Sequence, residues 1–208
     1  MARYIESVCK LCRREQMKLF LKGDKCYTKC VFEKRPTTPG MAKPQRGKPS
    51  PYAIRLREKQ KLRRFISVNE RPFERIVANA SKSPEASGEF LLRALEMRLD
   101  NVIRRMGVAT SLKTARQLVL HGHVKVSGKV VTIPSFQVDR GDVVALSPKL
   151  KENVGVKLSL DTAKRLNNRP SFLEFNEEGL LAKITRLPER AEMSFPVSEQ
   201  LIIEYYSK

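Results

Sequence analysis

No stretch of apolar residues in this 208-residue sequence approaches the length that a helix needs to cross a bilayer, so we expect no contact with a membrane. The N-terminus is charged and has no apolar segment of the secretory type, which predicts a cytoplasmic protein with reduced cysteines. The chain has only two histidines, and neither a glycine-rich phosphate loop nor a nucleophile pair is recognisable. These absences argue against a membrane protein and against an enzyme.

Acidic residues are also scarce: there are 22 Asp and Glu against 41 Lys and Arg, a net charge of +19. Such a charge attracts polyanions, because fixed cations release the counterions that surround phosphates. Residues 1–80 carry 21 basic and 7 acidic side chains, whereas residues 151–208 carry 9 of each. We therefore expect the polyanion surface in the first three quarters of the chain. The neutral last quarter, with exposed acids such as Glu177 and Glu178, is expected to contact protein as well as RNA.

Local signals divide the chain into helical and extended regions. Apolar spacing and caps predict helices that begin at Pro51 after Ser50, after Asn69, at Ser87 and after Ser111. The helix from Ser87 is expected to run unbroken to Met106, with Gly107 as its end. Alternating valines then predict strands around residues 124–130 and 143–146. A hairpin across Asn176–Gly179 and a final helix after Ser198 complete an α+β fold.

Several segments resemble a known family. Residues Leu95–Val102, Ser111–Val119 and His121–Gly128 are similar to the S-four RNA-binding domain. Further segments extend the likeness, in order, to the bacterial-type small-ribosomal-subunit protein four. They are Met1–Tyr4, Leu56–Arg64, Ile133–Ser135, Arg186–Pro188 and Glu199–Glu204. The resemblance therefore covers nearly the whole chain.

The resemblance implies both an architecture and a role. It predicts a four-cysteine segment and basic arm (1–45), a helical domain (46–92, joined by 188–208) and an inserted S-four domain (93–187). It implies a structural protein of the small ribosomal subunit that binds a multi-helix junction in the five-prime domain of ribosomal RNA early in assembly. The implied neighbours are ribosomal proteins five and twelve and messenger RNA at its entry path, with an effect on translational accuracy.

The four cysteines form two close pairs, Cys9 with Cys12 and Cys26 with Cys30. Each pair can chelate, and four thiolates match tetrahedral zinc. We expect one structural Zn²⁺ per chain, since four protein ligands leave no open position for substrate. The second pair has three intervening residues, where members of the family with such a site have four. An iron–sulfur cluster, or reduced cysteines without metal, stay open as alternatives.

The expected RNA-binding residues combine the arm, the basic helix and the S-four segment. Phosphate and ribose contacts dominate RNA recognition, which suits Lys and Arg on a helix. The histidines flank a helix-ending glycine beside other cations and are included as phosphate or base contacts. The set is Arg46, Lys48, Arg55, Arg57, Lys59, Lys61, Arg63, Arg64, Arg98, Arg104, Arg105, Lys113, Arg116, His121, His123 and Lys125.

Two other functions compete with this interpretation. Arg98-Leu99-Asp100 is similar to a trio that carries the catalytic aspartate of pseudouridine synthases, which suggests an RNA-modifying enzyme with an S-four domain. We instead expect Asp100 to be a helix-surface charge that orients an arginine, because the chain has no room for a separate catalytic domain. A zinc-containing nucleic-acid-binding regulator is the other alternative, but the cysteines are not followed by a recognition helix of standard type.

Overall fold

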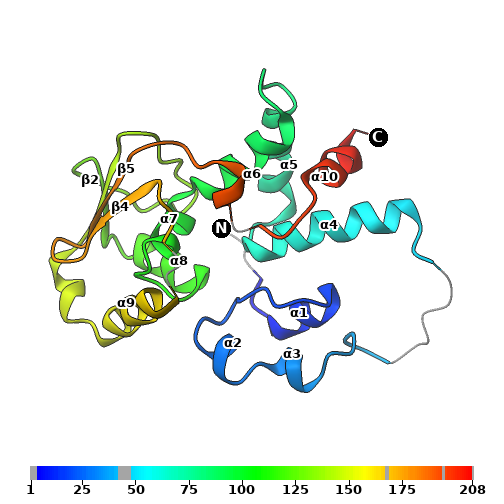
Figure 1. Cartoon of the computed structure of the whole chain (residues 1–208), viewed down its shortest axis with the longest axis horizontal. Helices are drawn as coiled ribbons and strands as arrows, with labels where there is room; N and C mark the ends of the chain where they lie inside the picture. Colours follow the sequence, from blue (N-terminus) through cyan, green and yellow to red (C-terminus); the bar gives the residue numbers. More distant parts are fainter. Residues whose placement is uncertain (1–3, 42–47, 167–168, 194, 208) are drawn as a thin grey trace. The chain divides into compact units, whose positions relative to one another are not determined.

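The computed structural model describes residues 4–41, 48–166, 169–193 and 195–207, which belong to two compact units (Figure 1). Unit 1 consists of Met1–Leu92 and Phe195–Lys208, and unit 2 of Arg93–Ser194. The sequence placed the boundaries after residues 92 and 187, and in the structure the second lies at residue 194. In the described ranges, no helix is both long and apolar enough to span a membrane.

Unit 1 begins with three short helices, α1 (Cys9–Glu15), α2 (Lys25–Thr28) and α3 (Val31–Lys34). The sequence analysis predicted no helix here, because each is too short to show a periodic pattern. Cys12 and Glu15 of α1 are buried. Leu19 and Leu21, in the connection to α2, are buried as well. The cysteine segment thus has a small interior of its own.

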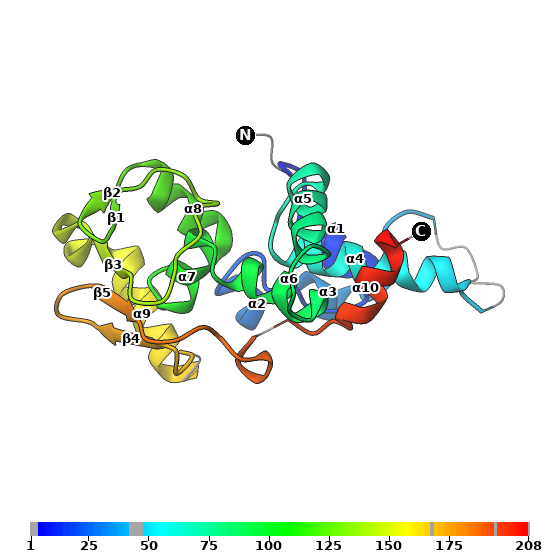
Figure 2. The same ribbon diagram turned by 90° about the horizontal axis from the view of Figure 1, so that it is seen from above.

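Longer helices form the rest of unit 1. Ser50 caps α4 (Pro51–Phe65) as predicted, with its Oγ accepting the Ala53 N–H at 3.2 Å. α5 (Glu70–Ala80) follows, and α10 (Glu199–Tyr206) lies along α4 in both ribbon views (Figures 1 and 2). Leu62, Phe73 and Ile202 are each 0% exposed. The C-terminal helix is therefore part of the core of unit 1.

The predicted helix from Ser87 to Met106 is wrong as a single element. The structure has α6 (Ser87–Glu96) and α7 (Leu99–Arg105), separated at Met97 and Arg98. Arg98 is extended (φ −68°, ψ 137°), and the N–H groups of Leu99 and Asp100 donate to carbonyls of residues 136 and 134. The apolar spacing runs through the break because the apolar side chains of α6 and those of α7 are both buried. The periodicity of the sequence therefore could not reveal the break.

Unit 2 contains one described antiparallel sheet in the order β2-β1-β3-β5-β4. Its strands are β1 (Val124–Val126), β2 (Lys129–Val130), β3 (Val143–Leu146), β4 (Leu173–Asn176) and β5 (Leu181–Ile184). Alternate residues of β1, β3 and β5 are buried, so one face carries the core. The predicted hairpin is β4–β5, and it joins the sheet through the pairing of β5 with β3.

Helices cover the apolar face of this sheet. Buried residues of α7 and α8 (Leu112–Leu120) share one core with those of the strands. Val156 of α9 (Val154–Leu166) joins the same core, following the 3₁₀ helix η1 (Pro148–Glu152). The sequence analysis did not predict α9 or η1. The mixed architecture confirms the α+β class. The zinc knuckle that formed part of the same prediction stays a prediction.

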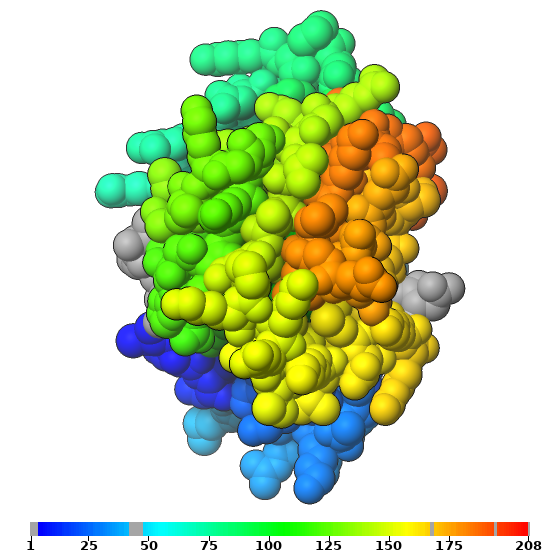
Figure 3. All heavy atoms as spheres, turned by 90° about the vertical axis from the view of Figure 1, so that its left-hand side faces the viewer, coloured from blue at the N-terminus to red at the C-terminus, as the bar shows by residue number. Residues whose placement is uncertain are grey.

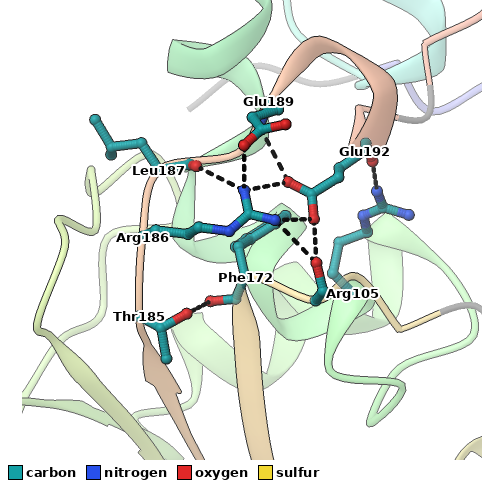
Figure 4. A network of polar contacts seen from close by, with 8 residues as sticks. Arg105, Phe172, Thr185, Arg186, Leu187, Glu189 and Glu192 are labelled. Carbon is teal, nitrogen blue, oxygen red and sulfur yellow. Dashed lines mark hydrogen bonds and ion pairs between the residues drawn. The ribbon is translucent and has the colours of Figure 1, made fainter.

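A carboxylate network holds the end of unit 2 together (Figure 4). Arg186 donates to both oxygens of Glu192, at 2.7 and 2.8 Å, and Ser171 donates to the same carboxylate at 2.5 Å. Glu189 and Glu192 form a reciprocal capping box on η2 (Arg190–Glu192), and Arg105 of α7 donates to the Glu192 carbonyl. These bonds explain why residues 188–193 belong to unit 2. The sequence analysis had assigned them to the helical domain.

We predict that this network makes unit 2 sensitive to acid. Burial raises the pKa of Glu192, but hydrogen bonds from Ser171, the Glu189 N–H and Arg186 outweigh it, and the pKa lies below its ordinary value of 4.5. A lowered pKa stabilises the fold above the unfolded-state pKa, and this contribution is lost as the pH falls through the folded-state pKa. Urea unfolding between about pH 7 and 3 should therefore show a smaller pH dependence for Glu192→Gln than for the wild type. Glu178→Gln, at an exposed carboxylate, should keep the wild-type pH dependence; equal pH dependence in all three proteins would contradict the assignment.

Candidate nucleic-acid interface

The predicted cations of α4 lie along one helix, but carboxylates of unit 1 engage each of them. Arg55 pairs with Glu204 at 2.6 Å, and Arg63 with Glu70 at 3.5 Å. The other pairs are Lys61 with Glu58, and both Arg57 and Arg64 with Glu15. Partly exposed cations in such pairs keep donors for a phosphate, because a guanidinium has five N–H groups. Arg55, Arg57, Lys61, Arg63 and Arg64 therefore stay in the predicted set.

Lys59 is a correction. Lys59 is 4% exposed, and its Nζ donates to Glu70 at 2.6 Å. The same Nζ lies 4.6 Å from the ring centroid of Tyr205. Tyr206 donates to the same carboxylate at 2.8 Å. Burial raises the pKa of Glu70, but the bonds from Lys59 and Tyr206 outweigh it and lower the pKa overall. Lys59 thus joins α4 to α10 and is not placed to bind RNA.

Two predicted cations of unit 2 are also buried. Arg98, 3% exposed, donates to both oxygens of Asp100 at 3.1 and 2.9 Å. Arg105, 7% exposed, pairs with Glu96. Asp100 itself is 0% exposed, so its prediction as a surface charge is wrong, although its predicted role in orienting an arginine is right. Arg98 and Arg105 therefore leave the set of expected phosphate contacts.

Asp100 also faces a cation of α8. Its Oδ2 lies 3.5 Å from Nε of Arg116, whose side chain is 16% exposed. Arg104, half-buried on α7, donates to Asn101 at 3.2 Å. Arg104 and Arg116 are thus fixed at the edge of the core, and each reaches the surface in part.

The exposed cations of unit 2 follow from local sequence. Ser111 caps α8, and its Oγ accepts the Thr114 N–H at 3.3 Å, which leaves Lys113 in the first turn and exposed. Lys125 points outward between the buried Val124 and Val126 of β1. In the described part of the chain neither lysine has an ion pair. A helix N-terminus beside exposed lysines is a favourable place for phosphate.

The two histidines lie between α8 and β1. His121 is exposed and His123 half-buried, with ring centroids 6.2 Å apart. Figure 3 shows a face of the molecule on which green and yellow-green segments of unit 2 lie side by side. Lys113 lies in the first turn of α8, whereas His121 follows the last residue of that helix, and His123 and Lys125 come directly after it. These cations are therefore spread over consecutive elements of unit 2. In unit 1, Lys48 is exposed before α4, and Arg46 lies outside the described residues.

The sequence analysis missed the carboxylates that hold these cations. Glu15 is the clearest case, since its side chain is 1% exposed although it is charged. A weak signal was present: Glu15 follows Cys12 by three residues, the spacing of one helix face. Glu177, predicted to be an exposed acid, is half-buried and pairs with Lys164 at 2.6 Å and Arg169 at 2.9 Å. The predicted exposure is therefore wrong for Glu177 and right for Glu178, and the contact with protein stays a prediction.

The cysteines share one region of unit 1. The Cys26 Sγ accepts the Lys22 N–H at 3.3 Å. Burial raises the pKa of Cys12, a bond from the Leu19 N–H lowers it, and the thiols of Cys26, Cys9 and Cys30 raise it further. The four thiols are thus within electrostatic range of one another. As they lie, however, no three Cys, His, Asp or Glu side chains of the described ranges are grouped closely enough to hold a metal ion.

Comparison with known proteins adds independent evidence. Residues 3–96 match the family model described as ribosomal protein S4/S9 N-terminal domain, and residues 97–144 match the S4 domain. The chain is 51% identical to the small ribosomal subunit protein uS4 of Thermodesulfovibrio yellowstonii, over the full length of both. Full-length identity is 50% to uS4A of Symbiobacterium thermophilum and 46% to uS4 of Thermus thermophilus.

We predict that Asp100 is the main polar support of unit 2. Asp100→Ala should leave the buried Arg98 without its partner and destabilise the unit by about 3–5 kcal/mol. Asp161→Ala removes an exposed carboxylate of α9 and should change stability by less than about 0.5 kcal/mol. Urea unfolding, with hydrogen exchange to identify the unit that opens, measures both. Equal unfolding midpoints for the two variants would refute this role.

Proposed function

The chain belongs to the ribosomal protein S4 family, and on that premise we propose that it binds small-subunit ribosomal RNA as a structural part of the small ribosomal subunit. The observation that carries the proposal is the 51% identity, over full length, to a relative named small ribosomal subunit protein uS4. A structural role replaces the alternative of an RNA-modifying enzyme. The protein would then be located in the ribosome, in the cytoplasm.

The physical basis of RNA binding is the net charge of +19 together with the partly exposed cations. Lysines bind phosphate as point charges, whereas arginines held by carboxylates offer oriented N–H groups. If about six cations neutralise phosphates, affinity should fall by about three orders of magnitude between roughly 50 and 200 mM salt. The buried Lys59, Arg98 and Arg105 contribute to the fold, not to this number.

Finer features of the role are proposed from the family resemblance. They are early binding to a multi-helix junction of the five-prime domain, contact with ribosomal proteins five and twelve, a place at the messenger-RNA entry path and an influence on accuracy. The neutral last quarter and the exposed Val154, Leu158 and Leu166 of α9 support a protein neighbour for unit 2. Crosslinking in intact subunits, followed by identification of the attached proteins, tests these neighbours.

We predict that Lys113 and Lys125 contact RNA phosphates. Replacing both with Ala should weaken binding to small-subunit ribosomal RNA and reduce the slope of log affinity against log salt by about two. The matched control removes two exposed lysines outside the predicted set, Lys149 and Lys157, and lowers the net charge equally. Filter binding over a salt series, with circular dichroism to check folding, distinguishes the two double variants. Equal losses in both would show that net charge, and not these two positions, determines binding.

We also propose that Cys9, Cys12, Cys26 and Cys30 hold one structural zinc ion. The paired spacing, the N–H···S bonds and the electrostatic proximity of the thiols support it. Binding would require the thiols to draw closer than they lie. Zinc would supply a tetrahedral crosslink within the first 35 residues, with no open position for chemistry.

Elemental analysis of the reduced protein is expected to find one zinc per chain, and Cys9→Ser should lose it. Because thiolate coordination and local folding are coupled, hydrogen exchange in this variant should rise in residues 4–35 while unit 2 stays protected. Iron in place of zinc would indicate a cluster. Reduced protein that contains neither metal would overturn the proposal.

A further inference from the structure

We propose that Glu15 is a positioning residue for RNA phosphate recognition: its buried carboxylate holds Arg57 and Arg64 as an anion-binding pair. This inference rests on the proposed function, because it assigns the arginine pair to RNA. Glu15 is the last residue of α1, in the cysteine segment, whereas both arginines belong to α4. The segment would therefore serve RNA binding through a carboxylate that does not touch RNA.

The geometry brings two turns of α4 to one oxygen atom. Arg57 and Arg64 are seven residues apart, about two helical turns, and so project from the same side. Nη1 of Arg57 lies 3.3 Å from Oε1 of Glu15, and Nη1 of Arg64 donates to the same Oε1. The Glu15 side chain is 1% exposed, whereas those of Arg57 and Arg64 are 41% and 20% exposed. One edge of each guanidinium is thus held from inside while part of it reaches solvent.

The charges of this cluster leave it positive. Two guanidiniums against one carboxylate give a local net charge of +1, and Arg63 lies nearby. Burial lowers the pKa of Arg64, and the positive charges of Arg57 and Arg63 lower it further against the opposing effect of Glu15. Crowded cations of this kind are stabilised by a second anion. In the described part of the chain, the two guanidiniums make no further hydrogen bond, so several of their N–H groups remain for a phosphate.

The position of Glu15 is otherwise unfavourable. A carboxylate at the C-terminal end of a helix opposes the helix dipole, and its burial carries a desolvation cost. The backbone around it is nevertheless fixed. Arg13 donates to the Thr37 carbonyl at 2.8 Å, and Gln16 donates to the Pro36 carbonyl at 3.0 Å. Hydrogen bonds thus hold the end of α1 on both sides of Glu15, which suits a residue that orients two long side chains.

The sign of one substitution separates positioning from net charge. Glu15→Gln removes a negative charge, so long-range electrostatics alone would tighten RNA binding. If Glu15 positions the arginines, the same change weakens binding, by about tenfold if one charge-assisted contact is lost. The salt slope should also fall by about one. Glu33→Gln is the matched control, because it makes the same charge change in the same segment at a carboxylate that pairs with Lys18.

The experiment is filter binding of the full chain to five-prime-domain ribosomal RNA over a salt series, with circular dichroism as the folding control. We expect weaker binding and a lower slope for Glu15→Gln, and unchanged or slightly tighter binding for Glu33→Gln. Glu15→Asp keeps the charge but shortens the side chain by one methylene group, and it should also weaken RNA binding. This second variant keeps the test valid if Glu15→Gln does not fold.

A double-variant background shows whether Glu15 acts through the arginines. In Arg57→Ala/Arg64→Ala protein, adding Glu15→Gln should cause no further loss of affinity. A further loss there, or equal or tighter binding by a folded Glu15→Gln chain, would overturn the inference while leaving the proposed function intact. Wild-type protein that fails to bind the RNA in a salt-dependent way would instead refute the proposed function.

Discussion

Buried carboxylates that hold cations are the interaction on which both units depend. Acids are the minority charge in this chain, and several of them lie inside: Glu15 in unit 1, and Asp100 and Glu96 in unit 2. A buried arginine without a partner would destabilise the fold, whereas one bound to a carboxylate is both neutralised and oriented. The same bonds that permit arginines at the edges of the cores also decide which cations remain for RNA.

The parts of the fold that follow from neighbouring residues could be predicted. Ser50 with Pro51, and Ser111 with its apolar spacing, specify the starts of α4 and α8, and alternating valines specify β1. The break at Met97 and Arg98 could not be predicted, because it depends on carbonyls of residues 134 and 136. The sequence between Ser87 and Met106 contains only apolar spacing that suits a continuous helix.

The same distinction applies to the candidate interface. Lys113 and Lys125 were predictable because a cap and a strand alternation, both local, place them outside. The burial of Lys59 was not, because it depends on Tyr205 of α10, almost 150 residues away in the sequence. Likewise Arg55 meets Glu204, and Arg64 meets Glu15, only after the chain has folded. Composition reveals that a surface is basic, but tertiary contacts decide which cations it presents.

The discontinuity of unit 1 has a consequence for synthesis. Residues 93–194 are made before Phe195–Lys208, so unit 2 can fold while unit 1 still lacks α10. Until then Arg55 has no Glu204, Lys59 has no tyrosine ring above it, and the apolar contacts of Ile202 are missing. The nascent chain therefore carries a folded middle and an unfinished beginning. The basic helix α4 acquires its final arrangement only after α10 has been made, whereas unit 2 can fold without that helix.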